Sequence, residues 1–226
     1  MRLLLLALIL SFIGLSYACK GNFNPYTTTI GQCGSTDRTD WLPTDNAPVL
    51  TPANLDPAEL AVHEARMDHI LAMGTALKRK FVASIYHQNG TLMCTGVNMG
   101  KPNIISHGEI VAINNCTELH GITVFTNYTL YTTGEPCAMC AGALVWADFK
   151  TVVWGTYNSD LLCKICMSNI PMDSAYIFGR SYGLRSSSTT LIGGVRRAQA
   201  DAFFGSYCSN PNSIYYIQPK CACTPQ

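Results

Sequence analysis

Two short segments place metal-binding side chains at the starts of two predicted helices. The first is HGE at 107–109, which begins the helical pattern HGEIVAINNCTEL, and the second is PCAMC at 136–140, which begins PCAMCAGALVWADF. A strand is predicted between them, in ITVFTNYTLYTT. Cysteines three positions apart lie on one face of a helix, so the sulfurs of Cys137 and Cys140 can reach one ion. His107 at the neighbouring helix start completes three protein ligands.

The pattern predicts zinc, with a fourth position open for water. Both helix starts carry partial positive charge, which favours thiolates. Glu109 lies two residues beyond the histidine, near the metal but not bound to it. Its carboxylate is suited to move a proton from water to a leaving amine. The alternative is a disulfide between Cys137 and Cys140, which a regular helix disfavours because it points the two Cβ atoms apart.

The first 18 residues have the layout of a secretory signal peptide. Arg2 precedes an apolar run that ends at Ser16-Tyr17-Ala18, and we expect cleavage after Ala18. The run is shorter than the roughly 20 residues of a spanning helix, so no membrane segment is expected after cleavage. Without Arg2 the chain has 14 basic and 14 acidic side chains. This balance predicts a secreted protein with no basic patch for a nucleic-acid partner.

Eleven cysteines in an exported chain predict a disulfide framework. The second C-x-x-C pair, Cys163 and Cys166, has no metal-binding neighbours in the sequence, so it is expected to be structural. Other expected disulfide cysteines are Cys19, Cys33, Cys208, Cys221 and Cys223. Cys94 and Cys116 are expected to be free and buried. Because nine cysteines remain beside the zinc pair, at least one free thiol or intermolecular bridge is predicted.

Three glycosylation sequons begin at Asn89, Asn115 and Asn127, and they suit a secreted glycoprotein. Residues 19–57 are rich in turn formers and predict a loop-rich extension. Residues 58–207 are expected to form the zinc domain, and 208–226 a tail that contains cysteines. Within the domain, EARMDHILAMGTALKRK predicts a helix whose apolar face holds Met67, Ile70, Leu71, Gly74 and Leu77.

Helical and strand patterns alternate through the rest of the domain. FVASIYH and TLMCTGVN flank Asn89-Gly90 and predict a hairpin. TVVWGTY and TTLIGGV predict further strands, and VRRAQADAFFGSY predicts the last helix. This order favours a mixed sheet with helices on both faces.

H-x-E followed by P-C-x-x-C is the signature of zinc nucleobase deaminases. Residues of about 60–205 resemble the cytidine-deaminase-like fold, which includes guanine, cytosine and tRNA adenosine deaminases. The resemblance implies a three-layer α/β domain with a mixed five-stranded sheet, and commonly a homodimer. It also implies that His107, Cys137 and Cys140 bind Zn²⁺, that Glu109 carries the proton and that Asn98 holds the base.

The sequence gives conflicting indications of the base. HGE and TLYTT resemble cytosine deaminases, whereas Glu135 and Ala147 resemble the guanine and tRNA adenosine branches. We favour a guanine-type purine, as a free base or nucleoside, with Glu135 and Trp146 as candidate contacts. Trp146 is equally compatible with a core position. The alternatives are a cytosine or cytidine deaminase, a tRNA or nucleic-acid adenosine deaminase, and a secreted binding protein without catalysis.

Overall fold

The structure is a computed structural model, which describes residues 46–181 and 189–212. The predicted signal peptide, most of the extension and most of the tail lie outside the described residues. The predictions for Cys19, Cys33, Cys221 and Cys223 therefore stay predictions. Across the described part of the chain, no helix is long and apolar enough to cross a membrane.

A six-stranded mixed sheet forms the middle layer, in the order β1-β6-β5-β4-β2-β3. Its strands are β1 (Val49–Leu50), β2 (Val82–His87), β3 (Leu92–Val97), β4 (Tyr128–Gly134), β5 (Thr151–Thr156) and β6 (Thr190–Ile192). β2 pairs antiparallel with β3 and β4, whereas the pairs β4–β5, β5–β6 and β1–β6 are parallel. Five strands were expected. The sixth is β1, which comes from the segment predicted as loop and is too short to show an alternating pattern.

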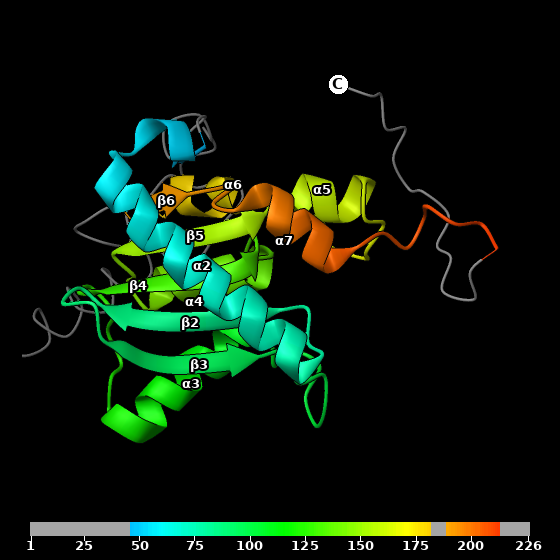
Figure 1. Cartoon of the computed structure of the whole chain (residues 1–226). Coiled ribbons are helices and arrows are strands. Elements are labelled where there is room, and N and C mark those ends of the chain that lie inside the picture. The colour runs from blue at the N-terminus through cyan, green and yellow to red at the C-terminus, as the bar shows by residue number, and fades with distance from the viewer. Residues whose placement is uncertain (1–45, 182–188, 213–226) are drawn as a thin grey trace, which may run out of the picture. The chain divides into compact units, whose positions relative to one another are not determined.

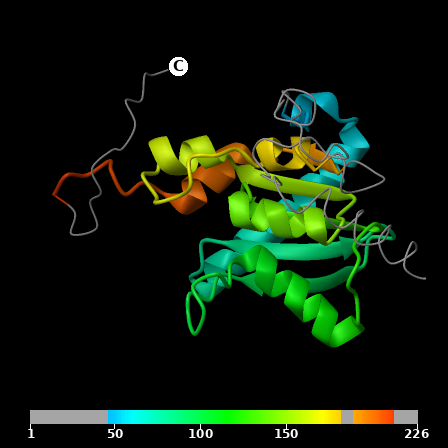
Figure 2. The same ribbon diagram turned by 180° about the vertical axis from the view of Figure 1, so that it is seen from behind.

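Helices cover both faces of the sheet, as expected for a three-layer α/β domain. α2 (Pro57–Leu77) and α7 (Arg197–Phe204) lie on the face seen in Figure 1. α3 (Gly108–His120) and α4 (Ala138–Trp146) lie on the opposite face, shown in Figure 2, and α6 (Ser174–Gly179) packs beside α4. The remaining elements are α5 (Asn158–Cys163), directly after β5, and a short 3-10 helix at Pro52–Asn54. The sequence patterns gave no prediction of α5 or α6.

Helix α2 begins and ends at recognisable signals. The Asp56 carboxylate accepts hydrogen bonds from the backbone N–H groups of Ala58 and Glu59, and the chain leaves the helix at Lys78 in a left-handed conformation. Leu77 was expected on the buried face but is 53% exposed. The buried stripe ends one turn earlier, at Gly74, which packs closely against Arg79 O and the Phe203 ring.

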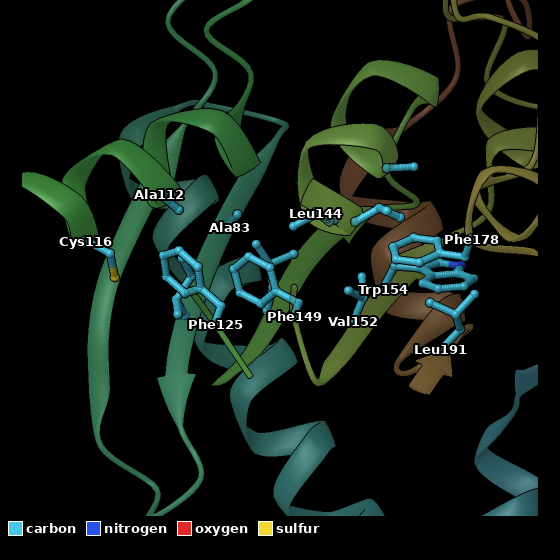
Figure 3. Close-up of a cluster of buried hydrophobic side chains, with 14 of the residues drawn as sticks. Ala83, Ala112, Cys116, Phe125, Leu144, Phe149, Val152, Trp154, Phe178 and Leu191 are labelled. Atoms are coloured by element: carbon cyan, nitrogen blue, oxygen red, sulfur yellow. The ribbon is translucent and has the colours of Figure 1, made fainter. Parts of the chain in front are cut away.

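The larger core cluster lies between the sheet and the layer of α3, α4 and α6. Phe125 and Phe149 stack in it with ring centroids 4.5 Å apart, and Trp154 is fully buried in it (Figure 3). The second cluster, under α2 and α7, contains Met67 and Tyr131. Both faces of β4 and β5 are therefore covered, which explains their nearly continuous burial.

Two disulfides are described, and one of them corrects an expectation. Cys94 and Cys116 are not free. They form a disulfide that joins β3 to α3, with Cα atoms 5.5 Å apart. Each position looked like an ordinary buried site because sequence does not show which cysteines face each other across packed elements. Cys166 pairs with Cys208, and Cys163 is also disulfide-bonded, so the structural role of the second C-x-x-C is confirmed.

His63 is a buried titratable group on α2. Its Nδ1 lies 2.7 Å from the Tyr131 hydroxyl and its Nε2 3.6 Å from the Glu59 carboxylate. Burial lowers the pKa of His63 and the nearby charge of Arg66 lowers it further, while Glu59 opposes both. The folded protein therefore favours the neutral imidazole.

We predict that stability falls as pH drops below the unfolded-state histidine pKa of about 6.5. A folded-state pKa below that value means that the unfolded chain binds the extra proton first. Urea unfolding should show a steeper loss between about pH 7 and pH 5 for the wild type than for His63→Gln. His120→Gln, at the exposed end of α3, is the matched control and should keep the wild-type slope. Equal slopes in all three proteins would contradict the prediction.

Candidate metal centre

The three predicted ligands lie where two helices begin. His107 is the N-cap residue of α3 and Cys137 is the N-cap residue of α4, with Cys140 in the first turn of α4. The expected helix start at Pro136 is thus two residues early. The α4 start follows the carboxyl end of β4, next to the parallel strand β5, which is where open α/β sheets commonly bind ligands.

The distances between the ligand atoms fit a zinc ion. His107 Nδ1 lies 3.6 Å from Cys137 Sγ and 3.5 Å from Cys140 Sγ, and all three atoms lie within 4.8 Å of one another. Tetrahedral zinc, with bonds of about 2.3 Å to sulfur and about 2.0 Å to nitrogen, separates such atoms by about 3.6 Å. Cys137 and Cys140 carry free thiols, so the disulfide alternative is not the one observed.

The thiols of Cys137 and Cys140 differ in their affinity for a proton. A hydrogen bond from Cys140 lowers the pKa of Cys137 to about 4, against the opposing effect of burial. The same hydrogen bond, together with burial, raises the pKa of Cys140. A hydrogen bond with Cys137 raises the pKa of His107. One thiolate is therefore available before metal binds, and the second thiol must release its proton to become a ligand.

Glu109 lies beside this group in the first turn of α3 and is only 4% exposed. Its Oε1 accepts a hydrogen bond of 3.2 Å from the Thr132 hydroxyl on β4. Burial raises the pKa of the Glu109 carboxyl, and the charge of Cys137 raises it further. A carboxyl group with a raised proton affinity is better suited than an ordinary one to accept a proton and then return it.

A cavity of about 150 Å³ opens at the ligand group. Five predicted residues line it: the metal ligands His107 and Cys137, and also Asn98, Glu109 and Glu135. The Asn98 Oδ1 atom is buried and has no hydrogen-bond partner among the described residues. A buried amide oxygen without a partner costs free energy, so a ligand N–H in the cavity would satisfy it.

Two predicted contacts are placed differently from their expected roles. Trp146 is 68% exposed, so the interpretation that it belongs to the core is wrong. It does not line the cavity either, so the cavity gives no support to the prediction that it stacks on a base. Glu135 does line the cavity, but its carboxylate accepts hydrogen bonds from Asn158 and Ser174 of the chain itself.

Sequence reasoning missed one side of the cavity. The side chains involved are Phe81, Leu161, Met167, Ser168 and Asn169. Phe81 was predicted only as the first residue of a hairpin strand, and 167–169 follow the second C-x-x-C directly. No local pattern marks these residues, because packing between distant segments sets their positions.

The comparisons with known proteins agree with this geometry. Residues 58–156 match the family model for the cytidine and deoxycytidylate deaminase zinc-binding region. A tRNA-specific adenosine deaminase from Rickettsia typhi is 34% identical over 80 residues, which are 34% of this chain and 54% of that protein. A cytosine deaminase from Candida albicans is 40% identical over 73 residues, which are 31% of this chain and 48% of that protein. The chain thus spans about half the length of these curated relatives.

Solved structures share the fold. The structure of guanine deaminase from Nitrosomonas europaea is 22% identical, covers 72% of this chain and 87% of its own, and has a TM-score of 0.52. A mutant protein in complex with 8-azaguanine is 26% identical, covers 64% of this chain and 83% of its own, and has a TM-score of 0.54. Residues 58–156 are thus similar to a deaminase zinc-binding region, and Zn²⁺ is the ion that the His/Cys/Cys group in this region binds.

We predict that zinc binding depends on Cys140 and not on the residue beside it. Cys140→Ser replaces a thiolate ligand with a weak hydroxyl donor, so the purified protein should fall from about one zinc per chain to almost none. Met139→Leu changes a neighbouring residue in the same first turn of α4 and should retain the metal. Elemental analysis of the full chain measures both. Full zinc content in Cys140→Ser would show that the ligand set is wrong.

Proposed function

We propose that this protein is an exported zinc-dependent hydrolase that deaminates a small nucleobase or nucleoside, with a guanine-type purine favoured. One observation carries the proposal: a three-ligand zinc group adjoins a buried carboxylic acid in the same cavity. Structural zinc sites have four protein ligands, whereas catalytic sites leave a position open. Within the described residues this group has three, which favours an enzyme over a binding protein that kept only the fold.

The proposed reaction replaces an amidine C–NH₂ bond with C=O, consuming one water and releasing one ammonia. Zinc, when bound, supplies a strong nucleophile at neutral pH by lowering the pKa of a coordinated water to about 7. Glu109 accepts a proton at its carboxylate and returns it to the departing amine nitrogen. Its raised pKa suits both halves of this task, and the Thr132 hydroxyl holds the carboxylate in place.

Asn98 orients the base in this scheme. Its unpartnered Oδ1 accepts an N–H of the bound base, while the apolar side chains of Phe81, Leu161 and Met167 cover the ring. Purines and pyrimidines both offer such an N–H group. This contact therefore supports a nucleobase without selecting one.

The preference for a purine rests on different support. The related structure at 26% identity is in complex with the purine analogue 8-azaguanine. Glu135 does not help to choose between a purine and a pyrimidine, because its carboxylate accepts hydrogen bonds from Asn158 and Ser174. The relatives include a cytosine deaminase and a tRNA-specific adenosine deaminase, so both of these activities stay as alternatives. The balanced charge of the chain favours a small molecule over RNA.

We predict ammonia release from guanine by the zinc-loaded full chain. The assay compares guanine, adenine, cytosine, their nucleosides and a short oligonucleotide at equal concentration. Faster release from cytosine would replace the purine proposal with the pyrimidine alternative, and salt-sensitive turnover of the oligonucleotide would favour the nucleic-acid alternative. Silence across the panel, with one zinc bound per chain, would contradict the proposed function.

Disulfides and sequons support the export part of the proposal. The bonds at Cys94–Cys116 and Cys166–Cys208 suit an oxidising compartment. Asn89 lies exposed in the β2–β3 turn and Asn127 lies exposed just before β4. Asn115 differs, because it is partly buried within α3 and its Nδ2 donates to Thr95 O at 2.8 Å. A homodimer, which the resemblance implies, also belongs to this proposal and is tested by sedimentation.

We predict glycans on Asn89 and Asn127 but not on Asn115 when the chain passes through a eukaryotic secretory pathway. A glycan on Asn115 Nδ2 would separate α3 from β3 and disturb the Cys94–Cys116 bond. Glycosidase treatment followed by mass spectrometry should remove two glycans from the secreted wild type. It should remove only one glycan from Asn89→Gln and only one from Asn127→Gln. Retention of the chain inside the cell, or a third glycan at Asn115, would contradict the prediction.

A further inference from the structure

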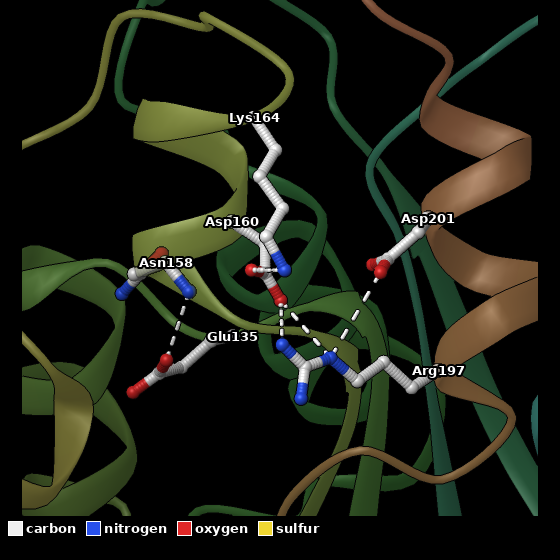
Figure 4. A network of polar contacts seen from close by, with 6 residues as sticks. All are labelled: Glu135, Asn158, Asp160, Lys164, Arg197 and Asp201. Carbon is white, nitrogen blue, oxygen red and sulfur yellow. Dashed lines mark hydrogen bonds and ion pairs between the residues drawn. The ribbon is translucent and has the colours of Figure 1, made fainter. Parts of the chain in front are cut away.

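Glu135 is the first residue of the metal loop, which we define as residues 135–137 between β4 and α4, and it connects this loop to the wall of the cavity. It lies between the end of β4 and Cys137, and its side chain is 4% exposed. One carboxylate oxygen, Oε2, accepts from the backbone N–H of Asn158 at 2.9 Å, a contact drawn in Figure 4. The other, Oε1, accepts from both the backbone N–H and the hydroxyl of Ser174, each at 2.7 Å.

These donors belong to the first residues of two helices. Asn158 begins α5 and Ser174 begins α6. The first N–H groups of a helix have no partner inside the helix, and a negative charge there complements their partial positive charge. A single buried carboxylate thus caps two helices that start 16 residues apart in the chain.

The segment between the two helix starts supplies the missed side of the cavity except for Phe81. Asn158 Nδ2 donates to Pro136 O at 3.2 Å and to Met172 O at 3.1 Å. Asn169 Nδ2 in turn donates to Asn158 Oδ1 at 2.6 Å, and both Asn169 and Met167 line the cavity. Each end of this segment is therefore tied to the residues that precede the zinc ligand Cys137.

The far side of α5 is held independently of Glu135. Asp160 is 4% exposed, and it pairs with Arg197 of α7 at 2.5 Å and with Lys164 at 2.8 Å (Figure 4). The Cys166–Cys208 disulfide anchors the chain one residue before Met167. Losing the Glu135 contacts should therefore release the cavity side of the segment without unfolding α5.

We propose that Glu135 is a positioning residue that clamps the wall segment 158–174 to the metal loop and thereby sets substrate affinity, rather than a residue that contacts the base. This inference rests on the proposed function for its kinetic part only. In Glu135→Gln, one acceptor oxygen becomes an N–H₂ donor that faces an N–H donor of Asn158 or Ser174. At least one bond is lost, while the side-chain shape and the metal ligands are kept.

The test compares Glu135→Gln and Ser174→Ala with wild-type full chain loaded with zinc. Ser174 is fully buried and does not line the cavity, and its hydroxyl donates to Glu135. We expect amide hydrogen exchange in residues 164–173 to become about tenfold faster in both variants, with exchange in β4 and β5 unchanged and zinc content retained. Ser181→Ala, beyond the other end of α6, is the matched control, because its hydroxyl donates to Phe178 O instead.

Kinetics with the base identified by the panel give the second readout. We expect KM to rise about tenfold in Glu135→Gln and less in Ser174→Ala, with kcat changed less than KM. The double variant should resemble Glu135→Gln alone, since both changes weaken the same group of hydrogen bonds around residue 135. Unchanged KM in Ser174→Ala, with unchanged exchange in both variants, would overturn the proposal. If the wild type deaminates none of the compounds, the proposed function is wrong. The hydrogen-exchange result still tests whether Glu135 holds the segment 158–174 in place. If Glu135→Gln does not fold, Ser174→Ala decides it.

Discussion

Strand β3 and the first turn of α3 approach so closely at Gly96 that no side chain fits between them. A Cβ atom at that position would lie 2.2 Å from Gly108 O and 2.3 Å from the Ala112 backbone nitrogen. This contact fixes the start of α3 against the sheet, and with it His107 and Glu109. The Cys94–Cys116 disulfide holds the same helix to the same strand further along, so the helix cannot slide. The chemistry of the site depends on this placement.

The second helix start completes the site by a different route. β4 lies in the sheet with both faces covered, and the chain leaves it through Gly134, Glu135 and Pro136 to reach Cys137. Two helix N-termini thus converge on one point, and their partial positive charge favours the Cys137 thiolate. Glu109 is buried in the first turn of α3, where loss of solvent raises its proton affinity. The positions of the metal group and of the Glu109 carboxyl therefore follow from the same arrangement of helix starts.

The metal ligands could be predicted because their spacing is local: Cys137 and Cys140 share one turn, and HGE lies at a neighbouring helix start. The Asn89-Gly90 hairpin and the alternating layers are also local signals. The cavity wall could not be predicted in this way. Asn169 is held by Asn158, and Glu135 meets Ser174 39 residues later in the chain, so the contacts exist only after folding. The pairing of Cys94 with Cys116 was missed for the same reason.

The most direct measurement of the central claim compares ammonia release by wild type, Glu109→Gln and Glu118→Gln, each with its zinc content. Glu118 lies exposed near the end of the same helix, α3, and is the matched control. The account predicts about one zinc per chain in all three proteins, wild-type turnover in Glu118→Gln, and a loss of at least about 100-fold in Glu109→Gln. Turnover by zinc-loaded Glu109→Gln at the wild-type rate would contradict the account.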